Sequence, residues 1–101
     1  MKEFLTSISA VNDEFRIQIL AFLLIHGKSC VCEIQHALEV KQARLSTALK
    51  ILTQAEFLKM EKVGRRAYYS IASCNSLQEN LLKEIEQLPI KVPPKVDACN
   101  L

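Results

Sequence analysis

The sequence predicts a mainly α-helical (α+β) fold, a winged helix-turn-helix with a two-stranded β-hairpin as its wing. Three observations predict it: apolar residues recur at helical spacing through the first half of the chain, alternate with polar residues after Ala55, and return to helical spacing before Pro89. At 101 residues the chain has room for one domain. Its two Gly, three Pro and 50% hydrophobic residues exclude a loop-rich all-β chain and a disordered one.

Two helices are expected at the N-terminal end. The apolar positions of the first, short helix are Phe4, Leu5, Ile8 and Val11. The second begins at Asn12 or Asp13, either of which can cap it, and runs to about His26. We expect His26 to interact with the last carbonyl groups of this helix, and Gly27 to end it.

A helix-turn-helix is expected next, after a short segment at residues 28–30 that can be extended. Two helices joined by a turn of three or four residues are the layout of this motif. The turn, residues 39–41, lacks the common Gly, so the spacing alone predicts it. The inward positions of the two helices are Val31, Ile34 and Leu38, then Leu45, Leu49 and Leu52.

The alternating region predicts a hairpin, and one more helix follows it. Strands are expected at residues 57–62 and 66–71, around Gly64, which supplies the positive φ of a tight turn. Ser76 and Glu79 have the spacing of a capping box at the start of the last helix, which Pro89 ends. The apolar positions of that helix are Leu77, Leu81, Leu82, Ile85 and Leu88.

Positive charge is concentrated on the two elements that such a fold presents to DNA. The net charge is only +2, yet residues 41–70 hold seven basic and two acidic side chains. A groove-reading helix needs short polar side chains for base edges and cations for phosphates. A solvated surface would explain the basic helix alone, but the basic hairpin beside it favours DNA binding. The expected DNA-binding residues are Lys41, Gln42, Arg44, Ser46, Thr47 and Lys50 on the helix, and Lys62, Arg65 and Arg66 at the hairpin.

The segment Ser29-Cys30-Val31-Cys32-Glu33-Ile34 is similar to the metal-binding box of the arsenic-sensing branch of the ArsR/SmtB family of small bacterial metalloregulatory repressors. The resemblance to this family extends from about Asp13 to Ile71 and includes the helix with Leu45, Leu49 and Leu52 and the hairpin around Gly64. It implies a repressor of this fold that an inducer releases from DNA.

The chain departs from the family pattern at several positions. Gln35 stands where the arsenic box has a third Cys. Lys41 replaces the usual Ser at the start of the recognition helix, which we therefore expect to lack its cap, and Glu56 stands where Gly commonly closes that helix. Residues 76–88 contain no His and no Asp, so the zinc site that some members carry there is not expected.

Cys30 and Cys32 are candidate ligands for a thiophilic ion, because soft thiolates select such ions. In a regular helix they would point roughly 200° apart, so one ion can bind both only if this helix start unwinds or distorts. The resemblance implies arsenite (As(III)) or antimonite as the inducer, held by three sulfurs. The third is expected from Cys99, whose tail can extend roughly 3.3 Å per residue and can belong to the same chain or to a dimer partner. Cys74 is the alternative.

The expected function is that of a cytoplasmic, homodimeric repressor that pairs through its terminal helices. Its recognition helices would lie about 34 Å apart on palindromic operator DNA. Residues 1–88 would form the winged helix-turn-helix DNA-binding and dimerisation domain, and residues 89–101 a flexible C-terminal tail. The cytoplasm is expected because Met1-Lys2-Glu3 does not begin a signal peptide, and no apolar run is as long as a membrane span.

Three other functions stay open. With the same fold, the cysteines could make a thiol-based redox or sulfide sensor, or a sensor of soft divalent metals such as Cd, Pb or Zn. A protein-interaction domain that uses the apolar end helices is the third. An enzyme with a catalytic cofactor is not expected, because the sequence has no Gly-rich phosphate loop, no zincin motif and no acid–base constellation.

Overall fold

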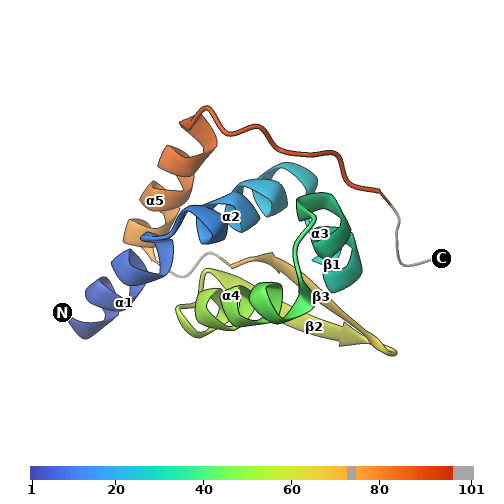
Figure 1. Cartoon of the computed structure of the whole chain (residues 1–101). Coiled ribbons are helices and arrows are strands. Elements are labelled where there is room, and N and C mark those ends of the chain that lie inside the picture. The colour runs from blue at the N-terminus through green and yellow to red at the C-terminus, as the bar shows by residue number, and fades with distance from the viewer. Residues whose placement is uncertain (73–74, 97–101) are drawn as a thin grey trace.

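The structure is a computed structural model that describes residues 1–72 and 75–96. Figure 1 shows α1 and α5 at one end of the molecule and the tip of the β2–β3 hairpin at the other. No helix in these described ranges is both long and apolar enough to cross a membrane. The elements are, in order, α1 (Lys2–Val11), α2 (Glu14–His26), β1 (Ser29–Cys30), α3 (Val31–Leu38), α4 (Gln42–Gln54), β2 (Leu58–Val63), β3 (Arg66–Ile71) and α5 (Ser76–Gln87).

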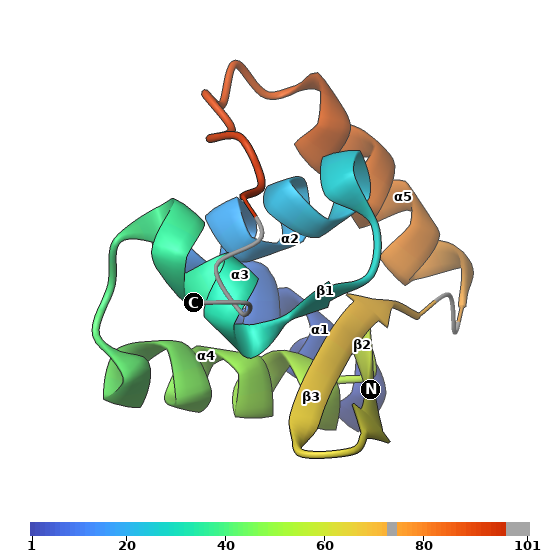
Figure 2. The same cartoon turned by 90° about the vertical axis from the view of Figure 1, so that its right-hand side faces the viewer.

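The order of elements confirms the predicted winged helix-turn-helix, with α3 and α4 as its two helices and β2–β3 as its wing. The sheet, however, has three strands and not two. The short segment at Ser29–Cys30 pairs antiparallel with β3, which gives the order β1-β3-β2. In this register Ser29 lies opposite Tyr69 and Cys30 opposite Tyr68. The chain between α2 and α3 is therefore paired with β3, the central strand of the sheet, and Figure 2 shows β1 beside β3.

The core is built around α2, which contacts α1, α4, α5 and β3. Its side chains include the fully buried Ile19, Leu20 and Phe22. From α3 and α4, Ile34 and the three leucines at positions 45, 49 and 52 pack into the same cluster, as their spacing predicted. Burial of each such large apolar side chain stabilises the fold by about 1.5–3 kcal/mol. The exposed face of α4 is thus fixed by the leucines on its opposite face.

Local backbone chemistry explains the ends of the elements. Of the two expected caps of α2, Asp13 is the one used, because its carboxylate accepts a hydrogen bond of 3.0 Å from the backbone N–H of Arg16. Gly27 after α2 and Gly64 in the wing turn both have positive φ, 74° and 63°. The role that Gly commonly has in the helix-turn-helix falls to Glu39, which ends α3 in the left-handed conformation.

The cap of α5 differs from the prediction. The N-cap residue is Asn75 and not Ser76, because the Asn75 side chain accepts a hydrogen bond of 2.8 Å from the backbone N–H of Gln78. The helix therefore begins at Ser76 itself. An Asn side chain has the same reach as an Asp side chain and caps a helix equally well. The capping-box pattern therefore predicted the correct turn but placed the N-cap one residue too late.

The segment after α5 differs more. Residues 89–96, which we call the C-terminal strap, were expected to begin a flexible tail, but they turn back along α2 and approach β1 (Figures 1 and 2). Ile90 and Val92 pack against the core cluster, and Lys95 is hydrogen-bonded to the start of β1. The alternation of apolar and charged residues in this segment buries one side against α2. Residues 97–101 lie outside the described part of the chain.

Candidate DNA-binding surface and cysteine site

The surface of α4 carries the expected DNA-binding side chains. All six expected residues from Lys41 to Lys50 are exposed, whereas Leu45, Ala48 and Leu49 between them are buried. Lys41 is the N-cap residue and makes no side-chain cap, as its replacement of Ser predicted. Thr47 donates its hydroxyl hydrogen to the carbonyl of Ala43, at 3.0 Å. The helix thus presents one polar, basic face.

Arg44 is the most constrained of these side chains. Its guanidinium carbon lies 4.1 Å from the centre of the Phe15 ring on α2, a cation–π contact. Within residues 1–72 and 75–96 the guanidinium has no hydrogen-bond or ion-pair partner. Stacking therefore limits the conformations of the side chain and leaves its five N–H groups free. An arginine held in this way is suited to a base edge or a phosphate group.

The wing supplies a second basic surface. Lys62 and Arg65 are exposed near the turn, whereas Arg66 is half-buried and has an interaction partner within the protein. The sequence interpretation missed the apolar side chains on this hairpin, Met60 and Val63, which are both about half exposed. Three residues apart on β2, they lie on opposite faces of the strand, and both faces are exposed beyond Leu58.

Cys30 lies at the junction of these DNA-binding elements. It is the N-cap residue of α3, it pairs with Tyr68 on β3, and it is only 1% exposed. Its backbone N–H donates a 2.9 Å hydrogen bond to the carboxylate of Glu33. Cys30 is also disulfide-bonded. A change at this sulfur therefore acts on the start of α3 and on the wing sheet together.

Cys32 has the opposite environment. It lies in the first turn of α3 with an exposed, free thiol. It borders an open depression of about 400 Å³ together with Gln35, His36 and Glu39. Within the described ranges no three Cys, His, Asp or Glu side chains are grouped closely enough to hold a metal ion. Cys32 is a free thiol, but Cys30 is buried and disulfide-bonded. Binding of one thiophilic ion by both sulfurs therefore requires reduction of Cys30 and distortion of the start of α3.

Two expected site residues lie outside the described residues. These are Cys74 and Cys99, the alternatives for the third sulfur. The two histidines are described. His36 is exposed on α3. His26 does not bond its own helix end as expected: its Nε2 lies 2.9 Å from the carbonyl oxygen of Pro93 in the strap.

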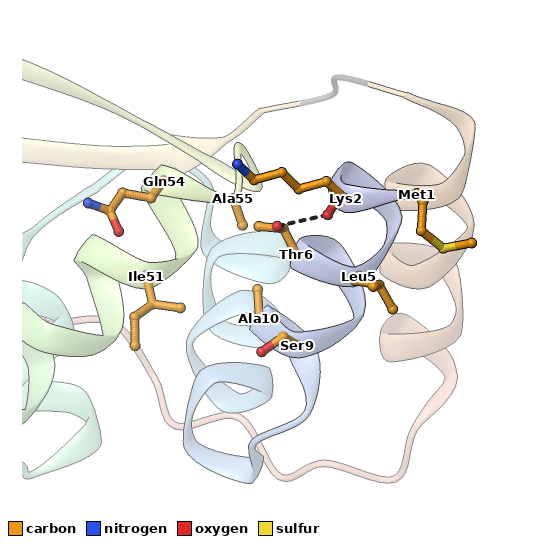
Figure 3. Close-up of a pocket in the computed structure, with 9 residues that line it drawn as sticks. All are labelled: Met1, Lys2, Leu5, Thr6, Ser9, Ala10, Ile51, Gln54 and Ala55. Carbon is orange, nitrogen blue, oxygen red and sulfur yellow. Dashed lines mark hydrogen bonds between the residues drawn. The ribbon is translucent and has the colours of Figure 1, made fainter.

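The terminal helices expose an apolar surface. Phe4, Leu5 and Ile8 of α1 are exposed, as is Leu88 at the end of α5. An open pocket of about 640 Å³ lies between α1 and the C-terminal end of α4, lined by residues such as Leu5, Ala10 and Ile51 (Figure 3). The apolar spacing of the end helices had predicted a partner-binding surface here.

One buried polar residue of this region was missed by the sequence interpretation. Gln78 on α5 is 2% exposed, and its side-chain amide donates hydrogen bonds to Ser7 on α1 and to the carbonyl of Ala55 after α4. A polar side chain in the first turn of a helix ordinarily faces water, so nothing in the sequence distinguished it.

Comparison with known proteins identifies this arrangement. A family model described as "Bacterial regulatory protein, arsR family" matches residues 13–59. An arsenical resistance operon repressor of Bacillus subtilis is 34% identical over 71 residues, which cover 70% of this chain and 68% of that protein. The chain belongs to the arsR family. A cadmium resistance regulatory protein CadC homologue of Staphylococcus aureus is 32% identical, over 61% of this chain and 51% of that protein.

Structural similarity agrees with the arsR assignment. A homodimeric winged helix-turn-helix DNA-binding domain from Mycobacterium bovis, described as a possible ArsR-family transcriptional regulator, has a TM-score of 0.72 at 25% identity. The alignment covers 84% of this chain and 76% of that one. This arsR-family chain is therefore a transcriptional regulator with a DNA-binding winged helix, and the expectation that it is not an enzyme is confirmed.

Proposed function

We propose that this protein is a cytoplasmic, homodimeric repressor that binds a palindromic operator and releases it when arsenite or antimonite binds Cys30, Cys32 and a third sulfur. Its relative from Bacillus subtilis, an arsenical resistance operon repressor, supports the inducer class. Residues 1–88 would bind DNA and dimerise, with the apolar surfaces of α1 and α5 as the interface. The homodimeric domain from Mycobacterium bovis supports that assembly.

DNA contact would use α4 in the major groove and the wing beside it. On α4, Gln42 and Ser46 have side chains suited to base edges, and Arg44 has free N–H groups held over Phe15. Lys41, Thr47 and Lys50 would contact the backbone, together with Lys62, Arg65 and Arg66 of the wing. Each cation that neutralises a phosphate would make binding more sensitive to salt.

The position of Cys30 is the observation that carries the inducer part of this proposal. Cys30 caps α3, which precedes the recognition helix, and pairs with Tyr68, which belongs to the wing. With Cys30 reduced, each As–S bond would replace an As–OH bond of arsenite, and the hydroxide would leave with the thiol proton as water. Convergence of the buried Cys30 sulfur and the exposed Cys32 sulfur would move the start of α3 and its pairing with β3. The recognition helix α4 and the wing would then no longer be positioned to contact successive grooves of the DNA.

Repression and induction are linked by one coupling free energy. A ligand that favours the conformation with poorer DNA contacts must weaken DNA binding by the factor by which DNA weakens the ligand. A coupling of about 1–3 kcal/mol, or roughly 5- to 150-fold in affinity, is usual for such pairs of sites. The same protein can therefore be a tight repressor without inducer and a weak one with it.

A single substitution tests the inducer site. Cys32→Ser removes one ligand from an exposed position, so operator affinity of the reduced protein should stay within about twofold of the wild type, while release by arsenite should disappear. Fluorescence anisotropy of labelled operator DNA, titrated with arsenite, measures both. The matched control is His36→Ala, an exposed residue on the same helix beside the same depression. Arsenite release of the Cys32→Ser protein would refute the site.

A second function is favoured by a specific observation, the disulfide at Cys30. Oxidation of this thiol, and not an ion, would then be the signal. Operator affinity of the reduced and the diamide-oxidised protein, each measured without metalloid, separates the two functions. A large loss on oxidation with no response to arsenite would support the redox sensor. Release by Cd²⁺ but not by arsenite would instead support a sensor of soft divalent metals.

A further inference from the structure

Lys28 lies in the loop between α2 and β1, and its side chain reaches across the wing sheet. Its ammonium donates a hydrogen bond of 3.2 Å to the carboxylate of Glu61 on β2 and lies 5.9 Å from the centre of the Tyr68 ring on β3. Cys30, Tyr68 and Glu61 lie opposite one another in the register of the three strands. Lys28 therefore contacts both strands of the wing from the edge of the sheet where β1 lies.

The outer part of the wing is a two-stranded hairpin. β1 pairs with two residues of β3, and beyond them the described chain continues the sheet with β2 and β3 alone. Residues 59–63 of β2 are all exposed. A hairpin of two strands is marginally stable in water unless it packs against further structure. The contact between Lys28 and Glu61 lies where the third strand ends, directly beside the basic Lys62.

The C-terminal strap holds the loop that carries Lys28. The Lys95 ammonium donates hydrogen bonds to the carbonyl of Lys28 at 3.0 Å and to the hydroxyl of Ser29 at 3.2 Å. The Ser29 hydroxyl in turn donates to the carbonyl of Gly27 at 2.9 Å. The backbone of residues 27–29 is thus bonded to one ammonium group of the strap, directly and through Ser29.

The strap is itself anchored before it reaches Lys95. Ile90 and Val92 pack against the core cluster, and His26 Nε2 on α2 lies 2.9 Å from the carbonyl oxygen of Pro93. The ring of Pro93 also fixes its backbone φ. A side chain that extends from a fixed backbone loses less conformational entropy when it forms a bond than one on a free chain. Lys95 is therefore placed to hold the loop at a low entropic cost.

We propose that the strap positions the wing for DNA, with Lys95 as a positioning residue that acts through Lys28 and Glu61. This inference rests on the proposed function in one respect, the contact of the wing with DNA. The strap begins at the end of α5 and passes over α2 towards β1, so it joins a terminal helix to the wing (Figure 2). Without Lys95 the loop would be free, and the hairpin would have to be ordered when DNA binds, which lowers affinity.

Hydrogen–deuterium exchange tests the inference without DNA. All thiols are kept reduced, so that the disulfide of Cys30 does not itself hold the sheet. Because exposed ion pairs stabilise weakly, we expect Lys95→Ala to speed exchange of the protected amides between residues 61 and 67 by about 2- to 5-fold. Lys91→Ala is the matched control, since Lys91 is an exposed lysine of the strap and is not the donor to the loop. Equal exchange in the two variants would overturn the inference.

A double variant tests whether Lys95 acts through Lys28. Lys28→Ala removes the contact with Glu61 but leaves the backbone carbonyl that Lys95 binds. In this background Lys95→Ala should not speed exchange of the wing amides further, because the contact through which it acts is already absent. An undiminished effect of Lys95→Ala in the Lys28→Ala protein would overturn the inference.

DNA affinity tests whether the position of the wing matters for binding. The probe is a labelled duplex that the wild-type protein selects from a randomised library. Lys95→Ala should bind this duplex about 2- to 5-fold more weakly than Lys91→Ala. In a background of Lys62→Ala/Arg65→Ala the effect of Lys95→Ala should vanish, because the cations that the strap positions are then absent. Equal affinities in the first comparison, or a full effect in the second, would overturn the inference.

Two further outcomes separate this inference from the proposed function. Lys95→Ala should remain a dimer in sedimentation velocity, as Lys91→Ala should. A monomeric Lys95→Ala protein would mean that the strap supports the dimer interface instead, which would overturn the inference. If the wild-type protein selects no duplex, the proposed function fails, and the exchange rates of the wing alone decide whether the strap holds it.

Discussion

The side-chain amide of Gln78 lies 2.7 Å from the carbonyl oxygen of Ala55, to which it donates a hydrogen bond. The same amide nitrogen donates to the hydroxyl of Ser7 at 3.2 Å. Gln78 belongs to α5, Ser7 to α1, and Ala55 closes the recognition helix α4. One buried side chain thus joins both helices of the proposed dimer interface to the end of the DNA-reading helix.

This contact predicts a loss of stability in Gln78→Met. Methionine has a similar length but leaves the Ala55 carbonyl and the Ser7 hydroxyl buried without this donor, which costs about 1–3 kcal/mol. Urea unfolding followed by circular dichroism measures the free energy of unfolding. Gln87→Met, an exposed position of the same helix, is the control and should change it by less than about 0.5 kcal/mol. Equal values for the two variants would contradict the role of Gln78.

The left-handed backbone of Glu39 predicts a gain in stability in Glu39→Gly. A side chain at φ 53° and ψ 52° is strained by about 1–2 kcal/mol, and Gly removes this strain while it increases the entropy of the unfolded chain. The net gain in the free energy of unfolding should be about 0.5–1 kcal/mol. His36→Gly, at an exposed helical position of α3, should instead lose about 1 kcal/mol. A lower free energy of unfolding in Glu39→Gly would show that the Glu side chain itself stabilises the turn.

The stacking of Arg44 on Phe15 predicts coupled effects on DNA binding. Arg44→Ala should weaken operator binding by about 1–3 kcal/mol, or roughly 5- to 150-fold, if it contacts a base edge. Phe15→Leu should weaken binding less, by about 0.5–1.5 kcal/mol, because Arg44 then has to be ordered on binding. In the double variant the Phe15 effect should vanish, which a double-mutant cycle of operator affinities measures. Additive effects would mean that the two residues act independently.

The exposed apolar surface of α1 predicts that Leu5→Glu disrupts the dimer. Leu5 is 57% exposed in the single chain, so its replacement should leave the fold intact while a charge enters the proposed interface. We expect a monomer in sedimentation velocity and at least tenfold weaker operator binding. Met60→Glu is the control for oligomeric state, because Met60 is a similarly exposed apolar residue on the wing. A dimeric Leu5→Glu protein would place the interface elsewhere.

Local sequence signals predicted most of the fold because each reports on a few neighbouring residues. Asp13, Gly27 and Gly64 act within one turn of their positions, and the three leucines of α4 mark one face of a helix. β1 was predicted only as a short segment that can be extended, because two residues are too short for any periodicity. Its pairing with β3 depends on where α2 ends in space. The packing of α2 in the core determines that position, and no local sequence pattern reports it.

Long-range contacts of polar residues were the part of the structure that the sequence did not predict. His26 was expected to bond its own helix end, but the carbonyl of Pro93, 67 residues later, is its partner. Gln78 is a polar residue of the kind that ordinarily faces solvent, yet its side chain is buried. Cys30 and Cys32 were expected to bind one ion together, but Cys30 is buried and Cys32 is exposed, because β1 turns the Cys30 side chain inward. Contacts between distant segments are thus visible only in the structure.

The antiparallel register of β1 with β3 has a consequence for variants of the wing. Cys30 faces Tyr68 in the sheet, and Arg66, two residues before Tyr68, faces Val63 at the hairpin end. In the reduced protein, substitutions that loosen the hairpin should therefore alter the reactivity of the buried Cys30 thiol, and binding of an operator that immobilises the hairpin should protect that thiol. Alkylation rates at residue 30 could thus report on DNA occupancy from inside the protein.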